Sequence, residues 1–251
     1  MHRFYLSPAQ ACGNQLTLGG REAHHALQVL RLRDGATVAV LDGAGQVLHC
    51  EVTGHTRDSL SLAVRERKLV PPPPCPITLV QAIPKGKIIE DIIQKATELG
   101  AARIVPLLSE RVVTQLDPDD AKAKAEKWQH VALEAIKQCG SAWLPKVEVP
   151  LTPRAFLARE QGCELSLIGC LEEGSRHPRV WLEKFFTEHQ RLPKSLSVWV
   201  GPEGDFSAAE YAAIQAAGVL PITLGALVLR VETAAIYGLS VVNYELSAAR
   251  S

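Results

Sequence analysis

Residues 1–70 consist mainly of short hydrophobic runs separated by turn residues. Strands are expected at 38–41, 47–52 and 59–64, because these runs have the length and composition of β-strands. One helix is expected around residues 24–30. Together these elements predict a small β-barrel domain at the N-terminus.

After residue 76, strand-like apolar runs alternate with longer segments of helical periodicity. Strands are predicted at 77–82, 103–107, 165–171 and 196–200, and helices at about 88–99 and 121–138. In the first helix the apolar residues recur at helical spacing, so one face is expected to pack on a sheet. Strands that alternate with helices predict an α/β fold with a mainly parallel sheet.

Four consecutive prolines, Pro71 to Pro74, mark the change between the two patterns. Consecutive prolines have no backbone donors and favour an extended, semi-rigid spacer. The predicted organisation is therefore a β-barrel at 1–70, a linker at 71–76 and an α/β domain at 77–251.

The composition limits the classes of protein that fit. The chain has 251 residues, enough for two domains with ample core, and its 27 basic and 27 acidic side chains balance. It has no apolar run long enough to span a membrane and no apolar signal core near Met1. The six cysteines form no C-x-x-C pair, which argues against a zinc site or a disulfide framework. A reduced, cytoplasmic location is expected.

Two glycine-containing segments near the C-terminus indicate a binding site: Gly201-Pro202-Glu203-Gly204-Asp205-Phe206 and 224–234. Each leaves an apolar run and enters a helix-like stretch, and Ser207 with Glu210 forms a capping box at the first helix start. Turns at the carboxyl ends of neighbouring parallel strands can build one small-molecule pocket. The alternative is that the same glycines are ordinary turn residues at the ends of strands and form no binding site.

Two common nucleotide motifs are disfavoured. No G-x-G-x-x-G follows a strand, and Lys85-Gly86-Lys87 lacks both the preceding glycine and the Ser or Thr of a P-loop.

The N-terminal part is mildly basic around residues 24–33, where His24 and His25 precede Arg31 and Arg33. This pattern fits either a surface for an RNA backbone or a solvated, arginine-flanked helix. A metal role for His24 and His25 is poor, because adjacent helical residues diverge in direction.

The order and spacing of many short motifs make the chain resemble a known family over nearly its whole length. The matching segments are Arg3-Phe4-Tyr5, His24-His25, Val29-Leu30-Arg31, Lys85-Gly86, 94–100, Pro106, Ser109-Glu110-Arg111, Lys127-Trp128, Glu134-Ala135, Gln138 and the two glycine segments. The chain resembles the RsmE-type 16S ribosomal RNA uridine-N3 methyltransferases of the SPOUT superfamily.

The resemblance implies a PUA-like RNA-binding barrel followed by an α/β domain closed by a deep trefoil knot, a rare exception to unknotted connections. It also implies that S-adenosyl-L-methionine binds in the knot, that no metal is required, that the protein is a homodimer and that its partner is 16S ribosomal RNA in the small ribosomal subunit. The residues expected to bind the cofactor are Cys170, Leu171, Gly201, Pro202, Glu203, Gly204, Leu224, Gly225, Leu229, Arg230, Glu232, Thr233 and Ala234. Those expected to contact RNA are Arg3, His24, His25, Arg31, Lys85, Lys95 and Arg111.

The chemistry of uracil suggests the catalytic residues. N3 of the neutral base carries a proton, so methylation at N3 requires deprotonation or stabilisation of the developing anion. A cation near O2 or O4 would stabilise this anion, and Arg230 is the first candidate for it, followed by Arg111 and Lys95. Arg230 could instead clamp a phosphate. Glu232 is expected to orient an arginine or take part in proton transfer.

The chain departs from the family pattern at Asp205, where a second glycine is common, at Val231, where threonine is frequent, and at Ser141, where an arginine is often found. Lys137 or Lys146 is the nearest replacement for the missing arginine. The alternatives are a knotted methyltransferase for another RNA or base, and a non-catalytic RNA-binding assembly factor. An apolar stripe in the last helix, at Ala235, Ile236, Leu239 and Val242, fits either a dimer contact or the core.

Overall fold

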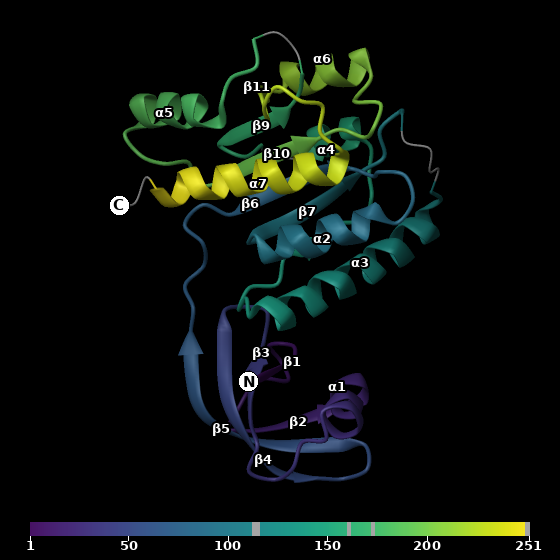
Figure 1. Cartoon of the computed structure of the whole chain (residues 1–251), viewed down its shortest axis with the longest axis vertical. Helices are drawn as coiled ribbons and strands as arrows, with labels where there is room; N and C mark the ends of the chain where they lie inside the picture. The colour runs from purple at the N-terminus through teal and green to yellow at the C-terminus, as the bar shows by residue number, and fades with distance from the viewer. Residues whose placement is uncertain (112–115, 160–161, 172–173, 249–251) are drawn as a thin grey trace. The chain divides into compact units, whose positions relative to one another are not determined.

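The structure is a computed structural model that describes residues 1–111, 116–159, 162–171 and 174–248 (Figure 1). The chain forms two compact units. The first comprises Met1–Pro72 and Leu133–Leu144, and the second comprises Pro73–Ala132 and Pro145–Ser251. The division near Pro72 falls among the four prolines, whereas no sequence pattern assigned 133–144 to the first unit.

The first unit is built on a five-stranded sheet with the order β1-β3-β4-β5-β2. Its elements are β1 (His2–Tyr5), β2 (Gln15–Gly19), α1 (Gly20–His24), the π-helical η1 (His25–Val29), β3 (Thr37–Leu41), β4 (Gln46–His55) and β5 (Ser59–Leu69). The β1–β3 pair is parallel and the other pairs are antiparallel. Fully buried Phe4, Leu18 and Leu48 belong to its core. The expected strands are present in longer form, and the expected helix around 24–30 is split between α1 and η1.

The C-terminal end of helix α3 (Pro118–Cys139) belongs to this first unit and is capped by Arg3. The Arg3 guanidinium donates to the carbonyl oxygens of Gln138 at 2.8 Å and Lys137 at 3.3 Å. A cation suits these free carbonyls at a helix C-terminus. Gly140 follows with φ +85°, and a Cβ there would lie 2.9 Å from Arg3 Cζ. Glycine therefore permits both the turn and the contact.

The second unit contains a six-stranded sheet with the order β11-β9-β10-β6-β7-β8, in which every pairing is parallel. Its strands are β6 (Ile77–Ala82), β7 (Ala101–Leu107), β8 (Lys146–Val147), β9 (Leu165–Gly169), β10 (Leu196–Val200) and β11 (Leu220–Ile222). Its other helices are α2 (Ile88–Glu98), α4 (Pro153–Arg159), α5 (Pro178–His189), α6 (Ala208–Ala216) and α7 (Val231–Ala248). The α/β class predicted from the alternating pattern is confirmed.

Helices cover both faces of this sheet (Figure 1). Helix α7 packs against β10 and β6, and α2 packs against β7 and α7. On the other face, Phe156 of α4 and Ile214 of α6 join a core cluster with Trp199 of β10. Within α7 the side chains of Ala235, Leu239 and Val242 are all buried. The stripe that fitted either a dimer contact or the core therefore lies largely in the core. Among the described residues, no helix has the length and hydrophobicity needed to cross a membrane.

Just before β9, Glu164 forms a charged clamp with Arg191 and Lys194, and the contribution of this clamp to the stability of the second unit can be tested. The Glu164 carboxylate accepts hydrogen bonds from the Arg191 guanidinium at 2.7 and 2.9 Å and from the Lys194 backbone N–H at 2.7 Å. These bonds, first to Arg191 and then to Lys194, lower the pKa of Glu164 from 4.5 to about 2. Because the ionised form is favoured in the folded state, its stabilisation is complete above the unfolded pKa and disappears as the pH falls through the folded one.

Glu164→Gln is therefore expected to lower the melting temperature at pH 7. The difference in melting temperature between the variant and the parent chain should become smaller as the pH falls from 4.5 to about 2. Thermal melts across this pH range measure it, and a gap that does not depend on pH would contradict the assigned clamp.

Candidate functional site

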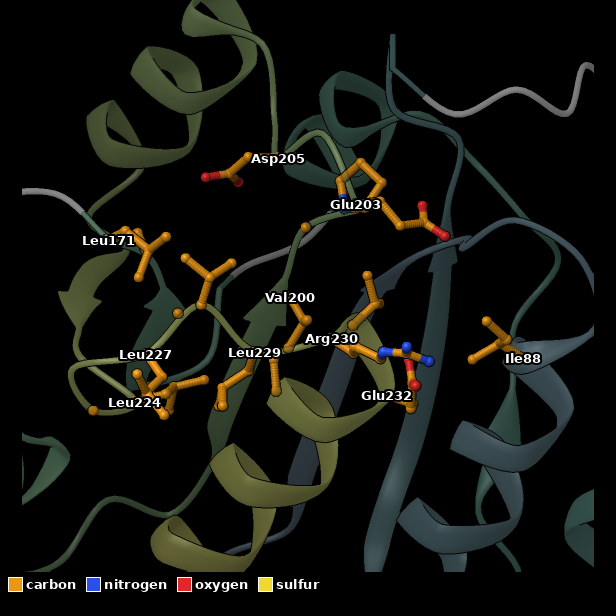
Figure 2. A pocket seen from close by; sticks show the side chains of 18 residues that line it. Ile88, Leu171, Val200, Glu203, Asp205, Leu224, Leu227, Leu229, Arg230 and Glu232 are labelled. Carbon is orange, nitrogen blue, oxygen red and sulfur yellow. The ribbon is translucent and has the colours of Figure 1, made fainter.

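A pocket of about 490 Å³ lies at the carboxyl ends of the central parallel strands of the second unit. It is formed where the loops after β9, β10 and β11 meet the start of α7, so the two glycine segments are neighbours in space (Figure 2). Its lining residues are Ile88, Gly169, Cys170, Leu171, Val200, Gly201, Pro202, Glu203, Asp205, Leu224, Gly225, Leu227, Val228, Leu229, Arg230, Val231, Glu232 and Ala234.

Backbone geometry explains the glycines in these loops. A Cβ on Gly201 would lie 2.7 Å from Asp205 Oδ1, and one on Gly169 would lie 3.1 Å from Leu224 Cδ1. Gly225 has φ +111°, a conformation that other residues rarely adopt. The predicted capping box is confirmed: Ser207 Oγ accepts from the Glu210 N–H at 3.2 Å, and Glu210 Oε2 accepts from the Ser207 N–H at 3.0 Å.

The pocket has an apolar side and a charged side (Figure 2). Leu171, Leu224, Leu227 and Leu229 gather on one side, where Leu171 and Leu227 are 65% and 75% exposed. Glu203, Arg230 and Glu232 lie on the other side together with Ile88. Large exposed leucines beside a pocket are suited to an apolar ligand surface.

Hydrogen bonds connect the β10–α6 loop and the first turn of α6 to the loops that follow β6 and β7. Glu203 Oε1 accepts from the Lys85 N–H at 2.9 Å, and Glu210 Oε1 accepts from the Glu110 N–H at 2.9 Å. The Arg111 guanidinium donates to the Gly204 carbonyl oxygen. The charged side of the pocket is thus held by three loops rather than by one.

The end of β9 is fixed by the side chain of Cys170. The Tyr211 hydroxyl donates to Cys170 Sγ at 3.2 Å, and Ser175 Oγ lies 3.0 Å from the same sulfur. These contacts tie the strand end to α6 and to the segment after the β9 loop.

The structure brings most of the expected cofactor residues together, since all except Gly204 and Thr233 line the pocket. Among them are both proposed catalytic residues, Arg230 and Glu232. Sequence reasoning did not assign Ile88, Gly169, Val200, Asp205, Leu227, Val228 or Val231. Leu227, Val228 and Val231 lay within the second glycine segment, whereas Ile88 gave no signal of its own as the first residue of a helix.

The residues expected to contact RNA fall into separate groups. Arg3, His24 and His25 line a second cleft of about 510 Å³ within the first unit. Arg31 is exposed and has φ +54°, but it does not line this cleft.

In the second unit, Lys85 and Arg111 are exposed, and both bond to the β10–α6 loop next to the pocket. Lys95 lies two turns further along α2 than Ile88 and pairs with Glu98 at 3.5 Å, so the structure does not bring it to the pocket.

The two lysines considered as replacements for the missing arginine have acidic partners. Lys137 is only 13% exposed and pairs with Glu22 at 2.7 Å and Glu134 at 2.8 Å. Burial lowers its pKa, but the bonds to Glu134 and Glu22 outweigh burial and hold that pKa above its ordinary value. Lys146 pairs with Glu148 at 2.6 Å. Ser141 instead accepts from the Trp143 N–H and donates to the Trp143 carbonyl.

Asp205, the departure from the second glycine, should be energetically coupled to Gly201. Asp205 has φ +59°, and its Oδ1 accepts from the Phe206 N–H at 2.8 Å. Asp205→Gly relieves the left-handed conformation but loses that bond, so the stability should change by less than about 1 kcal/mol. Gly201→Ala should lower the free energy of unfolding by more in the parent chain than in the Asp205→Gly variant, because the new methyl group meets Oδ1 of Asp205. Urea denaturation of the four chains measures this coupling, and equal costs in both backgrounds would contradict it.

The pocket suits S-adenosylmethionine in size, lining and charge. Its volume lies within the range of about 300–1,000 Å³ typical of small-molecule sites. The leucine side suits an adenine ring, and the glycines let the loop backbone approach a ligand closely. Among the described residues, Glu203, Asp205 and Glu232 line the pocket against one cation, Arg230, and this acidic excess suits a ligand carrying a sulfonium and an ammonium group.

Two family models match the chain. An RNA methyltransferase domain matches residues 71–243, and an RNA methyltransferase PUA domain matches residues 18–64. The first includes the whole pocket, and the second includes most of the β-sheet of the first unit.

Individual relatives agree with these matches. The chain is 34% identical to the ribosomal RNA small subunit methyltransferase E of Synechocystis over 96% of its own length and 77% of that protein. A putative methyltransferase from Legionella pneumophila, solved with its bound cofactor S-adenosylmethionine, is 30% identical with a TM-score of 0.84 over 98% of this chain and 97% of that one. A ribosomal RNA small subunit methyltransferase E from Neisseria gonorrhoeae, bound to S-adenosylmethionine, is 25% identical with a TM-score of 0.83 over 97% of each chain.

Proposed function

The chain belongs to the family of the ribosomal RNA small subunit methyltransferases E, and from this membership we propose that it transfers a methyl group from S-adenosylmethionine to N3 of a uridine in 16S ribosomal RNA. The pocket carries the proposal, because it joins an apolar slot to a charged side that bears a cation and two carboxylates. Methyl transfer to a base needs both: a place for the donor and a group that stabilises charge on the acceptor.

The cofactor would be held by the backbone of the loops that begin at Gly201 and Leu224 and by the leucine side of the pocket. Cys170 and Leu171 would close the third wall at the end of β9. When bound, S-adenosylmethionine supplies a methyl group on a positively charged sulfur, which keeps the electron pair of the broken carbon–sulfur bond. The chain itself has to align the acceptor and manage its proton.

Arg230 would stabilise the uracil anion. It lines the pocket, and its guanidinium forms no hydrogen bond or ion pair with another residue in the described part of the chain, although its backbone carbonyl accepts from the Ala234 N–H. A guanidinium beside O2 or O4 lowers the energy of the charge that develops as N3 loses its proton. Glu232, two residues further on, would orient that guanidinium.

Ribosomal RNA would contact the first unit as well as the rim of the pocket. His24 and His25 lie at the cleft of the PUA domain, and Lys85 and Arg111 lie beside the pocket. Arg3 is the weaker candidate, because its guanidinium already bonds to the end of α3.

Family membership also supports a trefoil knot in the second unit and a homodimer in the cytoplasm. Exposed Phe186 of α5 and Tyr237 and Tyr244 of α7 offer an apolar surface for a second copy. Sedimentation at micromolar concentration should give a dimer, and a monomer alone would remove this part of the proposal.

The decisive test is methyl transfer from labelled S-adenosylmethionine to small ribosomal subunits that lack the modification, followed by mass spectrometry of the nucleosides. We expect 3-methyluridine. Another methylated nucleoside would move the reaction to a different base, and tight RNA binding without transfer would favour a non-catalytic assembly factor.

A further inference from the structure

Glu203 is fixed in an orientation that a cofactor contact alone does not explain. Its Oε1 accepts the Lys85 N–H at 2.9 Å, which joins the loop after β10 to the loop between β6 and α2. In Figure 2 its carboxylate lies on the charged side of the pocket, with Arg230 and Ile88, and away from the leucines. The second oxygen, Oε2, has no hydrogen-bond partner among the described residues.

Glu232, the other carboxylate on this side, has a structural reason for its position. It lies in the first turn of α7, where the helix dipole favours a negative charge. Glu203 lies in a loop before α6, where one hydrogen bond from the Lys85 backbone N–H holds Oε1 and leaves Oε2 oriented and available for a ligand.

We infer, on the basis of the proposed function, that Glu203 is the proton acceptor and the base-selecting residue of the reaction. The uracil ring would occupy the charged side between Glu203 and Arg230, with the apolar side chain of Ile88 against it. Glu203 Oε2 accepts the N3–H hydrogen bond and then takes the proton. The N3–H bond breaks, an O–H bond forms, and the electron pair left on N3 forms the bond to the methyl carbon. The proton leaves from Glu203 to solvent.

This arrangement also discriminates between pyrimidines. Uracil presents a donor at N3, whereas neutral cytosine presents an acceptor there. A carboxylate that faces cytosine N3 would be unpaired and repelled, and unpaired polar groups in a site cause strong rejection. Selection of uridine would then depend on one side chain.

Glu203→Gln tests the proposal with little disturbance, because its amide oxygen can still accept the Lys85 N–H. We expect kcat for 3-methyluridine formation to fall by at least about 100-fold, the range of a lost general base. The affinity for S-adenosylmethionine, measured by calorimetry, should change by less than about tenfold. The residual rate should rise about tenfold per pH unit, since hydroxide then has to take the proton, whereas the parent rate should level off. RNA containing 5-fluorouridine, whose N3 proton is more acidic, should partly rescue the variant.

Glu210→Gln is the matched control. Glu210 also accepts backbone N–H groups near the same loop, but it does not line the pocket. Its variant should keep the parent pH profile. With RNA that carries cytidine at the mapped target, Glu203→Gln should form 3-methylcytidine, which the parent chain does not.

The outcomes separate this inference from the proposed function. If the parent chain makes no 3-methyluridine, the proposed function fails first. If the parent chain does make 3-methyluridine, the two glutamate variants are compared. Glu203 is not the proton acceptor if Glu232→Gln, and not Glu203→Gln, is the variant whose pH profile changes and whose rate is rescued by 5-fluorouridine. A Glu203→Gln variant with an unchanged rate would overturn the proposal outright.

Discussion

Replacing Arg230 by methionine is expected to lower kcat for RNA methylation about 100- to 1,000-fold, the effect of removing one preorganised group that stabilises developing charge. The guanidinium lines the charged side of the pocket, and no other cation does so in the described part of the chain. Methionine keeps much of the length and apolar bulk of the side chain while removing its charge. Arg230→Lys should recover part of the rate, because lysine keeps the charge but not the planar fork of donors.

Whether the substitution changes kcat or KM distinguishes an electrostatic role of Arg230 from a phosphate-binding role. An electrostatic role predicts a loss in kcat with a small change in KM for RNA, whereas a phosphate clamp predicts the reverse. Steady-state kinetics with saturating S-adenosylmethionine make the distinction. Arg154→Met, on the exposed surface of α4 and outside the pocket, is the matched control. A rise in KM without a loss in kcat would assign Arg230 to RNA binding.

The central strands could be predicted from sequence because burial on both faces leaves an unbroken apolar run. The strands predicted at 77–82 and 196–200 match β6 and β10 in the structure. The edges were harder to predict. β1 and β2 in the first unit have exposed positions and few residues, and β8 has only two residues, so their patterns are weak. The π-helical turn of η1 also gave no signal, because its period differs little from that of an α-helix over so few residues.

The site could be predicted where chemistry and backbone coincide. Gly201 and Gly225 stood out because turns at strand ends need glycine, and both line the pocket. Ile88 and the Glu203–Lys85 bond could not be predicted, since they depend on which strands become neighbours. β6 pairs with β10 although 113 residues separate their ends at Ala82 and Leu196, and that pairing brings Lys85 to Glu203. Residue type alone likewise could not show that Arg3 would be used to cap α3.

Replacing Trp199 by alanine is expected to destabilise the second unit by about 3–5 kcal/mol, as for other buried large side chains. Trp199 packs in the core and lies next to the pocket in the chain. Its side chain is 2% exposed and packs edge-on against Phe156, with ring centroids 5.3 Å apart. Its indole N–H donates to Ser197 Oγ at 3.1 Å. Val200 and Gly201, which line the pocket, follow it directly in the chain.

Trp199→Phe separates packing from polarity. It keeps an aromatic ring against Phe156 but loses the indole bond, so the expected loss is about 1–2 kcal/mol. Ser197 keeps a partner in this variant, because its hydroxyl also donates to Ser166 Oγ at 2.8 Å. Urea denaturation of the three chains measures both values, and repeating it with S-adenosylmethionine shows whether the pocket survives, because a ligand that binds only the folded state raises the midpoint. If Trp199→Ala were as stable as Trp199→Phe, the contact with Phe156 would not support β10, and the pocket loops would depend on the hydrogen bonds of Glu203, Arg111 and Glu210 instead.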